Sequence, residues 1–195
     1  MHRKSLVLIA ITSGFASATY SIALVLMNGW IPLVTGLSKT EVMKINTYLL
    51  MLDFSALPFF GWIASKISRE KLMLSASLGV VFLAIPLVLL LKGASLWGVI
   101  VVRVAFVLFG VAFFAPFHAW AQQLIPSSCR YAVISLGYAL GTQGLGSPTA
   151  AFALWCFKTT GLISSVCWYW VALGVASSLA IVMNSIPKPL EESGT

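Results

Sequence analysis

The chain has 195 residues, of which 59% are hydrophobic and only 9% are charged, and its mean hydropathy is +0.98. A disordered chain needs low hydrophobicity and high charge, and a soluble domain carries about a quarter of charged residues, so both classes are excluded. The net charge of +7 comes from 12 Lys and Arg that form no long basic run, which argues against nucleic-acid binding. The sequence therefore predicts an all-α membrane protein embedded in lipid.

Charged clusters divide the chain into six apolar segments. Each segment meets the length of roughly 20 residues that a helix needs to cross the hydrocarbon core. Helices are expected because lipid offers the backbone no hydrogen-bond partner. We expect one six-span domain over residues 1–188 and a cytoplasmic tail over 189–195. The expected spans are residues 6–30, 43–65, 72–91, 95–118, 131–154 and 162–184.

The first segment raises the question of a signal peptide. The basic residues 2–4 and the small residues 16–18 have the pattern of a cleavable leader, but the apolar run continues to about Val34, which favours an uncleaved first span. Asn28 and Trp30 close this span near the non-cytoplasmic side and are candidates for an outer gate, and Pro32 predicts that the helix ends there.

The loops between the segments carry the topology signal. With the N-terminus on one side of the membrane, that side holds seven Lys and Arg and the opposite side holds four. Cytoplasmic loops carry the excess of positive charge, so we expect both termini in the cytoplasm and the domain in a bacterial-type inner (plasma) membrane. The seven are Arg3, Lys4, Lys66, Arg69, Lys71, Arg130 and Lys188, and the four are Lys39, Lys44, Lys92 and Lys158.

Two charges fall inside the apolar segments, Asp53 in the second span and Arg103 in the fourth. At 1.5 Å per residue we expect them at similar depths, roughly 16 and 12 Å from the non-cytoplasmic side. Intramembrane charges normally face a cavity or one another, so a mutual pair is the simplest interpretation. In the functional interpretation Asp53 carries a proton or binds a cation, and Arg103 binds a substrate carboxylate through its planar fork. A structural ion pair and the remnant of a decayed site are the alternatives.

The loop between the second and third spans reads GWIASKISREK. It resembles the signature loop of the major facilitator superfamily. Gly61, Lys66, Arg69 and Lys71 match that loop, while two serines stand where Asp and Gly are usual. A small residue lets helices approach closely, and the basic side chains could latch the cytoplasmic face by binding a carboxylate or a helix C-terminus. A positively charged loop without a latch is the alternative.

The junction of the fourth and fifth spans, residues 113–141, reads FFAPFHAWAQQLIPSSCRYAVISLGYALG. It resembles the metabolite:proton symporter branch of the same superfamily, which includes proline/betaine and dicarboxylate carriers. Gln123, Ser128 and Ala139 depart from the pattern of that branch. The matching residues are Leu124, Pro126, Ser127, Arg130, Tyr131, Ser135, Gly137, Tyr138 and Gly141.

The resemblance covers nearly the whole chain but only the second half of a twelve-span transporter. It implies two inverted three-helix units, with the substrate site between two such halves near the midplane. It also implies a partner, either a complementary N-terminal six-span half or a second copy of this chain. A non-transporting fragment or membrane interaction subunit left from a split transporter gene is the alternative.

The activity implied by the resemblance is proton-coupled symport of a small zwitterionic or organic-acid solute. Protonation of Asp53 would release Arg103 to the substrate. Tyr138 and Gln143 lie in the fifth span, which flanks the cavity by resemblance, and they either bridge helices or touch the solute. Arg130 joins the basic residues of the earlier loop in gating the cytoplasmic face.

The fifth span is also rich in glycine, with four between residues 137 and 146. This composition predicts the most deformable helix of the chain. Gly137 and Gly141 have the spacing of closely packed membrane helices.

Enzyme chemistry finds no support in the sequence. An intramembrane serine protease needs a Gly-x-Ser-Gly motif and a catalytic His, but residues 146–148 read Gly-Ser-Pro, and His118 lies at a span end, as an interfacial anchor does. No acidic cluster or phosphate-binding loop is visible, and the three cysteines have no metal-type spacing. We therefore predict no enzyme activity, no cofactor and no metal, and the lack of a selectivity motif argues against a channel.

Overall fold

The computed structural model describes residues 3–185, which fold into helices joined by short loops, with no strand among them. The predicted all-α class is therefore confirmed. Five stretches are long and apolar enough to cross a membrane, which supports a multi-pass membrane protein. Lys188 and the expected tail at 189–195 lie outside the described residues. The five stretches are Arg3–Thr35, Lys39–Lys66, Arg69–Leu89, Leu96–Gln123 and Ile163–Asn184.

Three of the elements are helices of other types that continue or join α-helices. The elements in chain order are α1 (Arg3–Tyr20), the π-helix η1 (Ser21–Leu26), α2 (Met27–Thr35), α3 (Lys39–Lys66), α4 (Arg69–Leu89), α5 (Leu96–Gln123), α6 (Arg130–Ala139), the π-helix η2 (Leu140–Gly146), α7 (Thr149–Thr160), the 3₁₀ helix η3 (Ile163–Cys167) and α8 (Trp168–Ser185).

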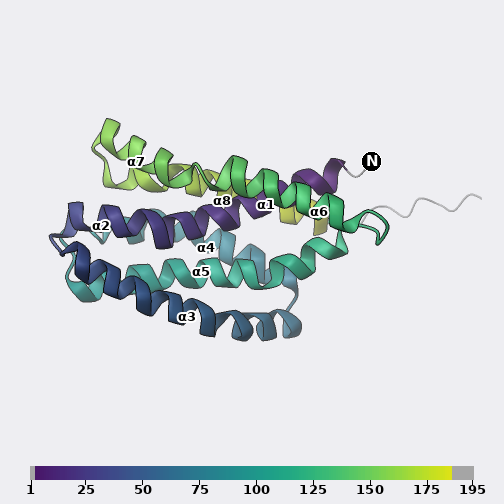
Figure 1. The fold of residues 1–195 in the computed structure, drawn as a ribbon, viewed down its shortest axis with the longest axis horizontal. Helices are drawn as coiled ribbons and strands as arrows, with labels where there is room; N and C mark the ends of the chain where they lie inside the picture. Colours follow the sequence, from purple (N-terminus) through teal and green to yellow (C-terminus); the bar gives the residue numbers. More distant parts are fainter. Residues whose placement is uncertain (1–2, 186–195) are drawn as a thin grey trace, which may run out of the picture.

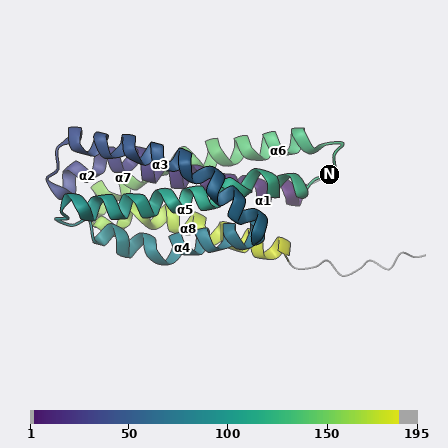
Figure 2. The same ribbon diagram turned by 90° about the horizontal axis from the view of Figure 1, so that it is seen from below.

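The helices run along the long axis of the molecule (Figure 1). Helix α1 packs against α5, α6, η2 and α8, while α5 packs against α3 and α4. The two views together place α3 and α6 toward one face and α4 and α8 toward the opposite face (Figures 1 and 2). Helices α1 and α5 therefore lie between these two layers.

Two expected helix boundaries differ in the structure. Pro32 does not end the first helix, which continues to Thr35 and stops at Gly36, whose φ of 74° is left-handed. Proline removes one backbone donor, but the helix end is set by the residue that leaves helical geometry. The expected span at 131–154 is not one regular helix, because it passes from α6 into η2 and is interrupted at Ser147 and Pro148 before α7.

Buried aromatic rings and hydroxyl groups join the helices in the core. The Phe15 ring meets that of Phe113 edge-on at 4.8 Å between centroids. Trp170 donates from Nε1 to Thr19 Oγ1 at 2.9 Å, which links α8 to α1. Lipid solvates apolar surface as well as a core does, so such packing and interhelical hydrogen bonds hold membrane helices together.

Helix α1 and η2 approach so closely that only glycine fits between them. A Cβ at Gly141 would overlap the carbonyl oxygen of Ala10 and the hydroxyl oxygen of Ser13. At Gly137 a Cβ would lie 3.0 Å from the Ile9 side chain. The close packing predicted for this pair of glycines is therefore confirmed. By contrast, a Cβ at Gly144 would meet nothing within 4 Å.

The substitution Gly141→Ala should lower the free energy of unfolding by about 2 kcal/mol, because the added methyl group forces α1 and η2 apart. Chemical unfolding of the chain in detergent micelles, followed by circular dichroism, measures this change.

The matched control is Gly144→Ala, in the same π-helix. It should change the free energy of unfolding by less than about 0.5 kcal/mol. Equal losses in both variants would show that glycine flexibility, and not close packing, stabilises this segment.

Candidate functional site

Arg103 lies in the middle of α5 and is fully buried. Its Nη1 donates to the Val42 carbonyl at 3.1 Å, and its Nη2 lies within hydrogen-bond distance of the Ala23 carbonyl at 3.2 Å. The same Nη2 reaches the side-chain oxygens of Asn28 at 2.9 Å and Asn46 at 2.6 Å. Four oxygens from two neighbouring segments therefore surround this guanidinium.

The π-helix η1 explains how a backbone carbonyl becomes available to Arg103. A π-helix bonds each carbonyl to the amide five residues on, as the Met27 N–H does with the Ile22 carbonyl. Ala23 lies in this turn, and its carbonyl accepts from Arg103. Arg103 thus ties the irregular part of the first crossing to the start of α3.

Asp53 does not pair with Arg103, which corrects the expected ion pair. Its Oδ1 accepts a hydrogen bond from Tyr20 Oη at 2.9 Å, and no ion pair to it occurs within residues 3–185. Asp53 follows Asn46 by seven residues on α3, or about 10 Å along the helix, so the two charges are not level. Arg103 instead finds neutral oxygens close at hand, which the signs of the charges could not predict.

A cavity of about 310 Å³ opens between α1, α5, α6 and η2, next to Tyr20. Tyr138 and Gln143, both expected in the fifth span, line it together with Tyr20. Asp53 is joined to its wall through the Tyr20 hydroxyl. Two of the four expected transport residues therefore line the cavity, Asp53 is joined to it only through Tyr20, and Arg103 lies apart. The remaining lining residues are Ala16, Ser17, Phe114 and Thr142.

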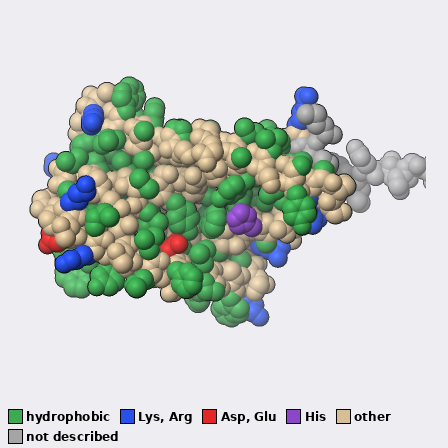
Figure 3. All heavy atoms as spheres, viewed as in Figure 1, with side chains coloured by type: hydrophobic (Ala, Val, Ile, Leu, Met, Phe, Trp, Pro, Cys, Tyr) green, Lys and Arg blue, Asp and Glu red, His purple; other side chains and the backbone are tan. Residues whose placement is uncertain are grey.

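Aromatic rings cluster around this cavity. The Tyr20 and Phe114 rings meet edge-on at 5.7 Å between centroids. The centroid of the Tyr138 ring lies 6.1 Å from that of Phe117 and 5.7 Å from that of His118, whose side chain is exposed. Figure 3 shows hydrophobic side chains over this face of the molecule with a histidine near its middle. The cavity thus has aromatic walls, has no Asp, Glu, Lys or Arg among its lining residues, and is linked to one carboxylate through the Tyr20 hydroxyl.

The expected gating loop is organised around Glu70, which the sequence interpretation missed. Its Oε1 accepts from Trp120 Nε1 of α5 at 3.2 Å and from Asn184 Nδ2 of α8 at 3.5 Å. One carboxylate therefore joins α4, α5 and α8 at this end of the bundle. A hollow of about 520 Å³ beside it is lined by Arg69 and five other residues.

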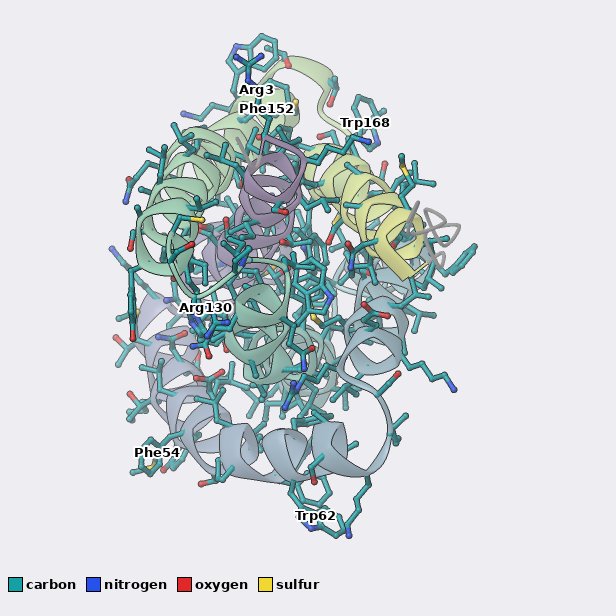
Figure 4. The ribbon with its side chains drawn as sticks, turned by 90° about the vertical axis from the view of Figure 1, so that its right-hand side faces the viewer. Arg3, Phe54, Trp62, Arg130, Phe152 and Trp168 are labelled. Carbon is teal, nitrogen blue, oxygen red and sulfur yellow. The ribbon has the colours of Figure 1, made fainter. Side chains whose placement is uncertain are left out.

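Among residues 3–185, the other expected gating residues make no contact of the kind expected for a latch. Lys66 and Lys71 are exposed, and a Cβ at Gly61 would meet nothing within 4 Å in this part of the chain. Arg130 donates from Nε to the Ile125 carbonyl at 3.2 Å, within its own loop. Figure 4 looks along the bundle from the end that carries Arg3 and Arg130.

Besides Glu70, the residues missed by sequence reasoning are uncharged. Tyr20 and Asn46 are polar residues inside long apolar helices, and this placement was the available signal.

Comparisons of the chain with models of protein families, with curated proteins and with solved structures give no match. The site is therefore interpreted from its own chemistry.

The substitution Arg103→Gln should lower the free energy of unfolding by about 3 kcal/mol, because several buried oxygens lose a charged donor. Denaturant unfolding in micelles measures the change. Lys158→Gln, at an exposed cation, should shift it by less than about 0.5 kcal/mol. If the Arg103 variant is as stable as the parent chain, the guanidinium does not hold the helices together.

Proposed function

We propose that this chain is one half of a secondary carrier of the major facilitator type, which moves a small zwitterionic or organic-acid solute together with protons. The observation that carries the proposal is the cavity beside Tyr20, which Tyr138 and Gln143 line and to which Asp53 is joined through the Tyr20 hydroxyl. Ligand sites are concave and mostly apolar, with a few polar groups that orient the ligand. This cavity has that composition.

The irregular helices on either side of the cavity add support. Tyr20 directly precedes η1, and Thr142 and Gln143 lie within η2. Transporter sites are typically formed where membrane helices are discontinuous, and π-turns occur frequently at functional sites. Two such segments flanking one cavity are therefore what a solute-binding site in a bundle requires.

We assign proton coupling to Asp53 and a positioning role to Arg103. The Asp53 carboxylate is partly buried and is bonded to a neutral phenol, so a proton can neutralise it without breaking an ion pair. Arg103 is fully buried among four oxygens and offers no open side to a solute in this conformation.

The exposure of α3 supports a partner half. In the most apolar 18-residue segment of α3, only 17% is buried within the protein. The corresponding share is 39–56% in the other four stretches that could cross a membrane. Phe54 and Trp62 point outward from this helix (Figure 4). We propose that the complementary six-span half, or a second copy of the chain, covers part of this surface and supplies the other wall of the cavity.

We further propose that both termini face the cytoplasm of a bacterial-type inner membrane. The end of the bundle with the N-terminus carries six basic residues within the described part of the chain, and the opposite end carries four. The basic loop residues Lys66, Arg69 and Lys71, with Gly61 and Arg130, would then lie on the gating side.

Uptake of labelled proline, betaine and dicarboxylates tests the proposal. It is measured in cells that express this chain alone, or together with the protein encoded immediately upstream of its gene. Uptake should rise as the external pH falls, because inward proton movement drives symport. Asp53→Asn should flatten the pH profile, since the amide cannot take up a proton. A profile that persists in this variant would exclude Asp53 as the coupling group.

Glu41→Gln provides the control on the same helix. Glu41 caps the start of α3 through Ser38, far from the cavity, and Gln can keep that capping role. This variant should retain the parent pH profile. If neither expression condition gives uptake of any solute, the chain is better described as a non-transporting membrane interaction subunit.

A further inference from the structure

We infer that a groove between the first turns of α1 and the last turns of α8 binds an anionic phospholipid, with Arg3 and Lys4 at its headgroup and apolar side chains along an acyl chain. The inference goes beyond the proposed carrier function, because it concerns a site for membrane lipid and holds whether or not the chain transports a solute. The groove is separate from the cavity beside Tyr20, with which it shares no lining residue.

The α8 side of the groove is apolar and open. The groove has a volume of about 720 Å³, within the range of ligand pockets, which span roughly 300–1,000 Å³. Ala176, Leu179, Ala180 and Met183 line it at helical spacing, so they lie on one face of α8, and the two alanines leave room between the helices. Leu179 is 57% exposed and Met183 is 72% exposed, so the groove opens at the surface of the bundle.

The α1 side gives the groove its polarity. Lys4, Val7, Leu8 and Ile11 line it from one face of α1, and Arg3 lies beside Lys4. The groove is therefore basic at one end and apolar along the rest of its length. The rise from Arg3 to Ile11 is about 12 Å, most of the roughly 15 Å that one leaflet contributes to the hydrocarbon core. A phospholipid has this polarity and length, because its charged headgroup is followed by an apolar chain.

The charges at the basic end select an anionic headgroup. Arg3 and Lys4 are exposed, and neither makes an ion pair or a hydrogen bond within residues 3–185. No Asp or Glu lines the groove, and Glu70, which accepts from Asn184 at its rim, is not among the lining residues. A phosphate group accepts charge-assisted hydrogen bonds from both kinds of basic side chain. In the proposed orientation this end faces the cytoplasm, where anionic lipids attract basic groups that flank membrane helices.

The position of the groove favours lipid over another protein. Arg3 points outward on the side of the bundle opposite to Trp62 of α3, so a partner half on α3 would leave the groove open to lipid (Figure 4). A second copy of the chain would have to bring a carboxylate to the basic end. Within residues 3–185, however, Glu41 lies at the other end of the bundle, Asp53 is bonded to Tyr20, and Glu70 is bonded to neighbouring helices.

Native mass spectrometry of the purified, delipidated full chain tests the inference, because it counts the lipids bound to each molecule. The chain is titrated in maltoside micelles with phosphatidylglycerol or with phosphatidylcholine of the same acyl chains. Phosphatidylglycerol should bind about tenfold more tightly and should raise the unfolding temperature, because only its headgroup carries a net negative charge. Equal affinities for the two lipids would overturn the inference.

Three variants locate the bound lipid. Arg3→Gln/Lys4→Gln should weaken the binding of phosphatidylglycerol at least about tenfold. Ala176→Phe, which places a ring in the groove, should weaken it as well. Lys66→Gln/Lys71→Gln removes two exposed cations from the same end of the bundle and should leave the lipid affinity unchanged. Undiminished binding in the Arg3/Lys4 variant, or an equal loss in the Lys66/Lys71 variant, would overturn the inference. Circular dichroism shows whether each variant is folded, and the two charge variants decide alone if Ala176→Phe is not.

The same spectra distinguish two other occupants of the groove. Glu191 and Glu192 follow α8 in the sequence, and Glu191→Gln/Glu192→Gln should not change the binding of phosphatidylglycerol. Binding that appears only in this variant would assign the groove to that acidic segment and overturn the inference. A dimer that phosphatidylglycerol dissociates and that Ala176→Phe abolishes would assign the groove to a second copy of the chain, which would also overturn it.

Discussion

A polar group inside a bilayer must find its partners within the protein, because lipid supplies none. Arg103 shows how this chain meets that constraint, since two backbone carbonyls and two asparagine side chains share one guanidinium. One of the carbonyls belongs to the π-helix η1, so the local irregularity of the first crossing and the buried charge of α5 depend on each other.

The same constraint leaves Asp53 in a different position. With Arg103 occupied, the carboxylate keeps only the Tyr20 hydroxyl among the described residues, and it lies partly exposed beside a cavity. The tight glycine packing of α1 against η2 fixes the two helices that carry Tyr20 and Gln143, so the cavity wall does not depend on flexible side chains alone. The two intramembrane charges are thus separated, one enclosed by neutral oxygens and one partly exposed.

Sequence reasoning located the helices because charged clusters interrupt long apolar runs, and it predicted the close packing of Gly137 and Gly141 from their spacing. It was wrong about the pair of intramembrane charges, since opposite signs say nothing about which oxygens the backbone exposes. Residues 21–26 contain no Gly or Pro that would mark a π-turn, so the acceptor at Ala23 had no sequence signal. Tyr20 lies 33 residues before Asp53, and only the packing of the helices brings them together.

The Tyr20–Asp53 hydrogen bond is the one direct side-chain hydrogen bond between α1 and α3 within residues 3–185. Helix α3 is otherwise held mainly against α5, and much of it is exposed. A proton on Asp53 would weaken this bond, because a neutral carboxyl group is a poorer acceptor than a carboxylate. The protonation of Asp53 and the position of α3 would therefore be linked through this contact. If a partner half covers α3, the same contact lies between the solute and the surface along which two halves of a carrier would move.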